Sequence, residues 1–343
     1  MRVQSLNFSS PAIGCADGYG NSSEQILFAL ERRGMHCIVD WQARPVGDVR
    51  SQYIRDREYE ECDARLYFVQ PYAWDRRTRA PIYGWTMYES DRLPDAWFTK
   101  MGNVDELWVP STWNQEIFSA ATNREVHLIP LGVNAQDFPC RPRRRGDKLR
   151  ILHFSTQAGE LRKGGDIAVK AFAAAFPRRK NVSMTIRSTW DCSMRIDDPR
   201  IALETGPITT AALADFYGRF DALLFPSRSE GFGMIPLEFM ATGAPAIFTS
   251  ATGMRDYANF GMAVSSTPSP ALVGVGRGAD APAWGYWYEP DFDEVVDRLR
   301  ELDTDYERVQ AQAVSEAAFI ASEWSWDRTA SSIIERLDYR LGR

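Results

Sequence analysis

The sequence predicts an α/β protein with two domains, each built on a parallel sheet that helices cover on both faces. Short runs rich in β-branched and aromatic residues alternate with segments whose apolar residues recur at helical spacing, a pattern typical of βαβ units. The chain has 343 residues, which is more than one domain usually contains. A stretch rich in proline and arginine, residues 139–148, interrupts the alternation and marks a linker.

The first half of the chain contains six expected strands and a glycine-rich loop. The loop follows the first strand and precedes a helix that we expect to end at Gly34. Gly18 and Gly20 in this loop could bring the backbone close to a phosphate, although a plain tight turn explains them equally well. The expected strands are 1–8, 36–41, 64–70, 81–88, 105–111 and 125–132, with helices at 24–34 and 113–121.

The second half repeats the alternation and ends in helices. We expect strands at 149–156, 182–189 and 222–227, and helices at 164–176, 210–220 and throughout 291–341. The predicted domains are residues 1–138 together with about 325–343, a linker at 139–148, and residues 149–324.

Composition limits the classes of function. The net charge of −6 gives no overall reason to expect binding to polyanions or anionic membranes. No apolar stretch reaches the roughly 18 residues of a membrane span, and the N-terminus lacks signal-peptide features, so we expect a cytoplasmic protein. Five scattered cysteines indicate reduced thiols, and three scattered histidines make no metal-binding set.

Two glutamates, Glu230 and Glu238, stand in an otherwise apolar run that follows the strand at 222–227. Ligands of open α/β sheets bind beyond the carboxyl ends of the strands, so this loop is a candidate site. Pro236 suits the first position of a helix, which would place Glu238 in the first turn. Backbone N–H groups there would suit a phosphate, and the carboxylates would accept hydrogen bonds from sugar hydroxyls. A glutamate that only offsets the helix dipole is the plainer alternative.

The full stretch SRSEGFGMIPLEFMATGAPAIFTS, residues 227–250, resembles the Glu-x7-Glu signature of retaining glycosyltransferases of family 4, which have the GT-B fold. Three further segments resemble the same family: VHLIPLGVNAQDF, LRKGGDIAVKAFAAAF and the closing WSWDRTASSI. The resemblance covers most of residues 105–340. It implies two Rossmann-like domains with a cleft between them, and a C-terminal helix that returns to the first domain.

The resemblance also implies roles for individual residues. Glu230 would lie against the donor sugar, Glu238 would bind the ribose hydroxyls, and Lys163 would bind the donor diphosphate. Gly231 and the backbone of Phe232, Gly233, Met234 and Ile235 would contact sugar and phosphate. Many family members carry an arginine five residues before this lysine, where this chain has Ala158; Arg162 or Arg187 would then supply the second diphosphate ligand.

The acceptor side is less defined in sequence. Glu89, Ser90 and Asp91 follow an expected strand of the first domain and would face the cleft, where the acceptor approaches. Asp91 and Asp95 are equally well explained as residues that start a helix around Pro94. Asp303 and Asp305 imitate a metal-binding Asp-x-Asp pair, but they lie between two helical patterns and fit a helix cap better.

The resemblance predicts a metal-independent hexosyltransferase without a cofactor, whose co-substrate is a UDP- or GDP-linked sugar. A glycan or glycolipid is the expected acceptor. Compact relatives occur in bacteriophages, so hydroxylated DNA bases or a virion protein are an alternative, which the arginine-rich runs favour. A sugar-nucleotide epimerase and a non-catalytic sugar-nucleotide-binding protein are alternatives of a different class. A donor-hydrolysis assay separates the binding protein from the enzyme.

Overall fold

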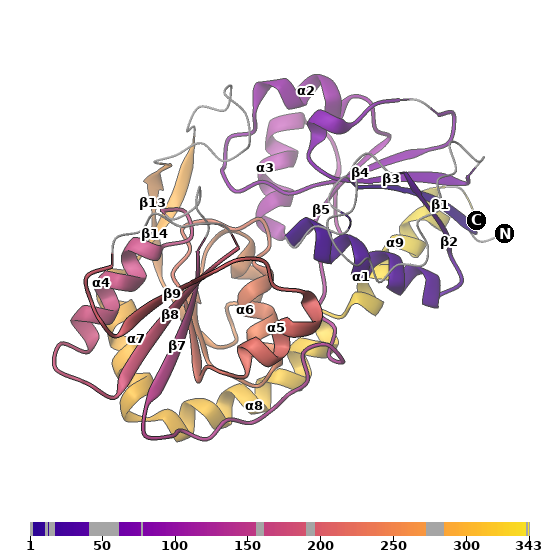
Figure 1. The fold of residues 1–343 in the computed structure, drawn as a ribbon. Helices are drawn as coiled ribbons and strands as arrows, with labels where there is room; N and C mark the ends of the chain where they lie inside the picture. The colour runs from indigo at the N-terminus through magenta and orange to yellow at the C-terminus, as the bar shows by residue number, and fades with distance from the viewer. Residues whose placement is uncertain are drawn as a thin grey trace. The chain divides into compact units, whose positions relative to one another are not determined.

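The computed structural model describes residues 3–10, 13, 18–40, 62–76, 78–155, 161–189, 196–271, 285–340 and 342. It divides into two compact units (Figure 1). Unit 1 comprises residues 1–88, 92–132 and 324–343, and unit 2 comprises residues 89–91 and 133–323. The segment 139–148 therefore belongs to the second unit, whereas the last helix belongs to the first.

Unit 1 is built on a sheet whose described strands are all parallel, in the order β2-β1-β3-β4-β5-β6. The strands β3, β4 and β5 are buried at every position, as expected for a sheet covered on both faces. The strands are β1 (Ser5–Ser9), β2 (His36–Asp40), β3 (Ala64–Phe68), β4 (Ile82–Trp85), β5 (Glu106–Val109) and β6 (Val126–Leu128). The helices are α1 (Gly18–Arg32), η1 (Pro71–Ala73), α2 (Asp95–Met101), α3 (Thr112–Thr122) and α9 (Trp326–Arg340).

Unit 2 has a second parallel sheet, in the order β12-β11-β10-β7-β8-β9, and a separate antiparallel hairpin, β13–β14. The strands are β7 (Leu149–Ser155), β8 (Val182–Ser188), β9 (Ile201–Thr205), β10 (Ala222–Phe225), β11 (Ala246–Thr249), β12 (Met262–Val264), β13 (Ser266–Pro270) and β14 (Tyr286–Pro290). The helices are α4 (Gly165–Ala175), α5 (Thr210–Tyr217), α6 (Met234–Ala241), η2 (Thr252–Tyr257), α7 (Phe292–Thr304) and α8 (Tyr306–Glu323). The predicted α/β class with two parallel sheets is thus confirmed.

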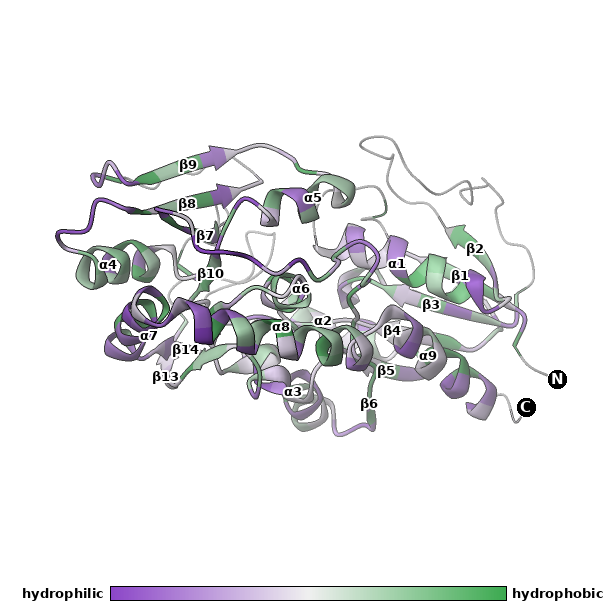
Figure 2. Cartoon of the chain, turned by 90° about the horizontal axis from the view of Figure 1, so that it is seen from below, coloured by the Kyte–Doolittle hydropathy of each residue, from purple (hydrophilic) through white to green (hydrophobic). Residues whose placement is uncertain are grey.

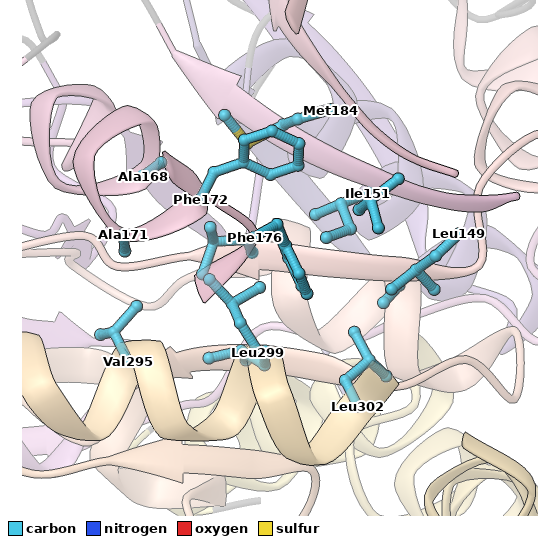
Figure 3. Packing of buried hydrophobic residues seen from close by; sticks show 14 of the residues in the cluster. Leu149, Ile151, Ala168, Ala171, Phe172, Phe176, Met184, Val295, Leu299 and Leu302 are labelled. Carbon is cyan, nitrogen blue, oxygen red and sulfur yellow. The ribbon is translucent and has the colours of Figure 1, made fainter. Parts of the chain in front are cut away.

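The core of unit 2 explains why its loops are held in place. Figure 3 shows Phe172 of α4 beside Met184 and Ile151 of the sheet, with Val295 and Leu299 of α7 below them in the view. All five side chains are buried. Figure 2 shows the same segregation by residue type, with hydrophobic β10 inside and hydrophilic residues along α7. The apolar stripes of α4 and α7 therefore fix the ends of β7 and β10, where the candidate site lies.

Two predicted details of the helices are corrected. Gly18 and Gly20 do not lie in a loop, because α1 already begins at Gly18. Ser23 is buried within this first part of the helix, and its hydroxyl donates to the carbonyl of Tyr19 one turn earlier. Likewise α6 begins at Met234 rather than at Pro236, which places Glu238 in the second turn. Gly34 does end α1, in the left-handed conformation.

Neither a membrane span nor a metal cluster is found in the described part of the chain. None of its helices is long and apolar enough to cross a bilayer. Its histidine, cysteine, aspartate and glutamate side chains form no group of three that could hold a metal ion. Of the cysteines, Cys37, Cys62 and Cys140 are described and are free thiols; Cys15 and Cys192 lie outside the described residues.

Candidate functional site

The candidate site of unit 2 is formed by loops at the carboxyl ends of β7 and β10. Gly164 joins them: its φ is 73°, and a Cβ atom there would lie 2.0 Å from the carbonyl oxygen of Pro226. Only glycine permits so close an approach of two backbones. The backbone N–H of Arg228 donates to the carbonyl of Arg162 at 2.7 Å, which completes the junction. The residues on either side of Gly164 are thereby brought against those that follow Pro226.

A buried ion pair between Lys163 and Glu230 is the centre of the site. Nζ of Lys163 lies 2.7 Å from Oε1 and 2.9 Å from Oε2 of Glu230. The side chains are only 11% and 10% exposed. Arg162 adds a second cation 3.2 Å from Oε1, and the Ser227 hydroxyl donates to the same oxygen at 2.7 Å. Two of the predicted donor ligands, Lys163 and Arg162, thus converge on the predicted catalytic carboxylate.

These neighbours hold Glu230 in its ionised form. Burial alone would raise the pKa of Glu230, but the charges of Lys163 and Arg162 and the hydrogen bonds from Lys163 and Ser227 outweigh it. The pKa therefore lies below its usual value. Burial also lowers the pKa of Lys163, an effect that the charge of Glu230 opposes.

The backbone after Glu230 is shaped by Gly233, which caps α6 with a φ of 90°. A Cβ atom at this position would meet the Tyr257 hydroxyl at 2.4 Å and Cγ of Met254 at 2.5 Å. The Tyr257 hydroxyl donates to the carbonyl of Gly233 at 2.6 Å, so η2 fixes this turn. The first N–H groups of a helix have no partner within the helix, and the positive end of its dipole favours an anion. The predicted backbone contacts, Gly231 to Ile235, all lie here.

Glu238 has an environment opposite to that of Glu230. It is buried on α6, and its Oε2 accepts a hydrogen bond from the Tyr217 hydroxyl of α5 at 3.0 Å. Burial raises the pKa of Glu238 to about 8; the Tyr217 hydrogen bond lowers it and the Asp137 charge raises it further. A carboxyl with this pKa is mostly protonated at neutral pH, so it can donate a hydrogen bond as well as accept one. No motif in the sequence indicates Tyr217 as its partner.

Arg228 is a second residue that the sequence does not reveal as part of the site. Its guanidinium is buried and donates to Asp166 of α4 at 2.8 and 2.9 Å and to Glu289 of β14 at 2.5 and 2.9 Å. The two hydrogen-bonded carboxylates raise its pKa against the effect of burial. Arg228 thereby ties the Lys163 loop and the β13–β14 hairpin to the Glu230 loop. Its only sequence signal is its position two residues before Glu230.

The remaining predicted residues lie elsewhere in the structure. Arg187 is the second-last residue of β8, and its guanidinium donates to the backbone carbonyls of Ser188, Glu204 and Gly206. Among the described residues, no hydrogen bond or ion pair joins it to the Lys163–Glu230 pair. Gly18 and Gly20 belong to unit 1. Ala158 lies outside the described residues, so the position of the expected second diphosphate ligand is not described.

The three residues predicted for the acceptor side, Glu89 to Asp91, group with unit 2. Asp91 accepts a hydrogen bond from the backbone N–H of Tyr286 in the hairpin, at 2.7 Å. Burial raises the pKa of Glu89, an effect that Arg162 opposes and that the Glu230 charge increases. The helix expected around Pro94 exists: Pro94 caps α2 and Asp95 is its first residue.

Comparison with known proteins identifies the family. Residues 111–333, well over half of the chain, match the family described as "Family 4 Glycosyltransferase in conflict systems". The chain belongs to this family. The family membership that the Glu230 and Lys163 segments predicted is thereby confirmed, and the curated relatives that the chain matches are glycosyltransferases.

The family 4 glycosyltransferase chain also resembles individual proteins. It is 26% identical over 227 residues to the D-inositol 3-phosphate glycosyltransferase of Paenarthrobacter aurescens, covering 61% of this chain and 50% of the relative. It is 32% identical over 129 residues to the enzyme of that name from Rhodococcus opacus, covering 38% of this chain and 24% of the relative. The chain therefore spans half or less of the length of these two curated relatives.

Solved structures share the fold of this chain over nearly its whole length. HepE of Anabaena, solved in complex with UDP and glucose, superposes with a TM-score of 0.70 at 12% identity and covers 98% of this chain and 100% of that one. Sucrose-phosphate synthase of Thermosynechococcus elongatus gives 0.68 at 14% identity, with 98% and 99% covered. These likenesses confirm the predicted GT-B fold.

Proposed function

We propose that this protein transfers a hexose from a nucleoside diphosphate sugar to an acceptor hydroxyl with retention of the anomeric configuration. The observation that carries the proposal is the buried Lys163–Glu230 pair beside the N-terminus of α6. Two cations and the N-terminus of α6 would meet the diphosphate, and an ionised carboxylate would meet the sugar. The complex of HepE with UDP and glucose supports a UDP-linked donor, with GDP as the alternative.

The reaction needs stabilisation of charge rather than a strong base. As the bond between the anomeric carbon and the phosphate oxygen breaks, its electron pair stays on the diphosphate, whose negative charge grows. Lys163 and Arg162 would stabilise that charge, and their contacts with Glu230 hold both cations in the site before the reaction begins, which is electrostatic preorganisation. The acceptor oxygen attacks the same face of the sugar, and its proton passes to a diphosphate oxygen. The ionised Glu230 would stabilise positive charge developing at the anomeric carbon.

The two glutamates divide the donor between them. Glu230 lies in the Lys163 cluster and would bind the sugar, whereas Glu238 lies on α6 with Tyr217 and would bind the ribose hydroxyls. Because the pKa of Glu238 is about 8, it can both donate to and accept from those hydroxyls near neutral pH. Protein cations would neutralise the diphosphate, which supports a reaction that requires no divalent metal and no cofactor.

For the acceptor we propose a glycan or glycolipid hydroxyl. The names of the curated relatives, which act on D-inositol 3-phosphate, support a polyhydroxylated acceptor. A hydroxylated nucleic-acid base or a protein is the alternative acceptor, since the family description refers to conflict systems.

The first experiment is a thermal-shift screen of nucleoside diphosphate sugars, followed by mass spectrometry of candidate acceptors incubated with the best donor. Lys163→Ala should abolish the shift, whereas Lys170→Ala, which removes an exposed lysine from α4, should retain it. A shift that survives Lys163→Ala would contradict the assigned site. Donor binding without hydrolysis or transfer to any acceptor would instead favour a non-catalytic binding protein.

A further inference from the structure

An arginine-lined cavity lies in unit 2, and the donor site does not account for it. The cavity has a volume of about 440 Å³, within the range of roughly 300–1,000 Å³ that is usual for small-molecule sites. It is formed by the linker segment 139–144, the region of α5 and the C-terminal end of α6. The lining residues are Pro139, Arg141, Pro142, Arg143, Arg144, Arg150, Ala214, Asp215, Gly218, Arg219, Asp221 and Thr242.

Three of the five arginines of the cavity have carboxylate partners. Arg141 pairs with Asp215 at 2.9 Å, Arg150 with Asp221 at 2.8 Å, and Arg219 with Glu204 at 2.7 Å. Arg143 and Arg144 have no carboxylate partner recorded among the residues that the structure describes. The cavity therefore has a surplus of two positive charges, although the whole chain carries −6.

Arg143 is held in the wall of the cavity by neutral groups. Its guanidinium donates to the backbone carbonyls of Tyr217 and Thr242 and to the Thr242 hydroxyl, at 3.2, 3.3 and 3.0 Å. Its buried Nε has no hydrogen-bond partner in the described part of the chain. Burial lowers the pKa of Arg143 to about 10, so it stays charged at neutral pH. It lies at the C-terminus of α6, whose dipole supplies only about half a negative charge.

We infer that this cavity binds a phosphate-bearing ligand at Arg143 and Arg144. Arginine presents its N–H groups as a fork that matches phosphate oxygens, and Arg143 and Arg144 both line this cavity, so one anion could contact both. The half charge at the end of α6 does not offset two cations, so the cavity favours an anionic ligand. The linker arginines, which the donor site leaves unused, thus form a second anion site, separate from Lys163.

The test uses pyrophosphate as the probe and hydrogen–deuterium exchange as the local readout. In the wild-type protein, pyrophosphate should slow exchange in the peptide that covers residues 139–144. Arg144→Glu reverses the charge of an exposed side chain, so the variant protein should still fold. The variant should lose this protection, and its affinity for pyrophosphate at this site should fall at least about tenfold. The matched control is Arg178→Glu, an exposed arginine of the loop after α4, which should keep the protection.

A second arm identifies the source of the phosphate. A short single-stranded DNA oligonucleotide that protects the same peptide, with loss of protection in Arg144→Glu, assigns the site to a nucleic-acid backbone; protection by pyrophosphate alone assigns it to a small phosphate compound. Either result supports the site. Equal protection in the wild type and Arg144→Glu, or equal loss in Arg144→Glu and Arg178→Glu, overturns it. Because the readout is at the linker, it is independent of whether Lys163 binds a donor.

Discussion

Nζ of Lys163 lies between the two carboxylate oxygens of Glu230, 2.7 and 2.9 Å away, although the residues are 67 positions apart in sequence. An anionic donor would have to share this lysine with the glutamate. Under the proposed function, Glu230 would compete with the diphosphate for Lys163 while holding the lysine side chain in the site.

Replacing Glu230 by glutamine should separate turnover from nucleotide binding. The loss of the carboxylate removes the charge that would stabilise the anomeric carbon, so kcat and kcat/KM should fall together by about 10²–10³. The affinity for the bare nucleoside diphosphate should stay or increase, because Lys163 no longer has a competing anion. Calorimetry and steady-state rates test this, with the exposed Glu307→Gln as control. Weaker diphosphate binding at normal turnover would reverse the assigned roles.

Donor binding should not require a divalent cation. In the proposed reaction, Lys163 and Arg162 would supply the positive charge that a metal would otherwise provide to the diphosphate. Calorimetric titration of UDP and GDP should therefore give the same dissociation constant in EDTA and in Mg²⁺, within about twofold. Strict dependence on Mg²⁺ would contradict the proposed role of these two side chains.

Glu238 should make stability fall as pH rises. Its pKa of about 8 in the folded protein exceeds that of the unfolded chain, so the folded state binds the extra proton. The contribution of protonated Glu238 to the free energy of unfolding is fully present below about pH 4.5 and is lost progressively up to about pH 8. Over that range the free energy of unfolding should fall by at most about 1.4 kcal/mol per pH unit. Denaturant unfolding between pH 5 and pH 8 should show this loss in the wild type, and Glu238→Gln should flatten it. Parallel curves for the two proteins would refute the shifted pKa.

Gly164→Ala should destabilise the protein and disturb the donor loops. The new Cβ would lie 2.0 Å from the Pro226 carbonyl, and the φ of 73° is strained for any side chain. We expect a loss of about 1–3 kcal/mol in the free energy of unfolding, together with weaker donor binding. Gly18→Ala is the matched control, since a Cβ atom there meets nothing within 4 Å and α1 tolerates alanine. Equal stability of the two variants would mean that the Pro226 contact relaxes.

The sequence predicted the fold and the two main loops of the candidate site, because both depend on local patterns. A window of a few residues is enough to recognise the helical spacing of apolar residues. The same holds for Gly233 before a helix and for the spacing between Glu230 and Glu238. The hairpin strand β13 was missed because its sequence, STPSP, has two prolines and reads as a loop. The strand β9 was missed because it is mostly exposed, and apolar and polar residues do not alternate regularly along it.

Pairwise contacts within the site were not predictable from one sequence. Tyr217 and Arg228 belong to it only through partners on other elements, Glu238 in one case and Asp166 and Glu289 in the other. Gly18 and Gly20 were placed in a loop because glycine usually interrupts helices, but the packing of α1 overrides that preference.

The Arg228 contacts also limit how far this protein can be divided. One buried guanidinium joins α4, the loop before Glu230 and β14, which are separated by more than a hundred residues of chain between Asp166 and Glu289. A fragment that ends before β14 would keep every residue of the Glu230 and Lys163 segments. It would lack Glu289, however, so the buried Arg228 guanidinium would lose one of its two carboxylate partners. We therefore expect that a short segment with only the Lys163 and Glu230 loops would not bind a sugar nucleotide. The smallest fragment that keeps the site intact would extend through the β13–β14 hairpin.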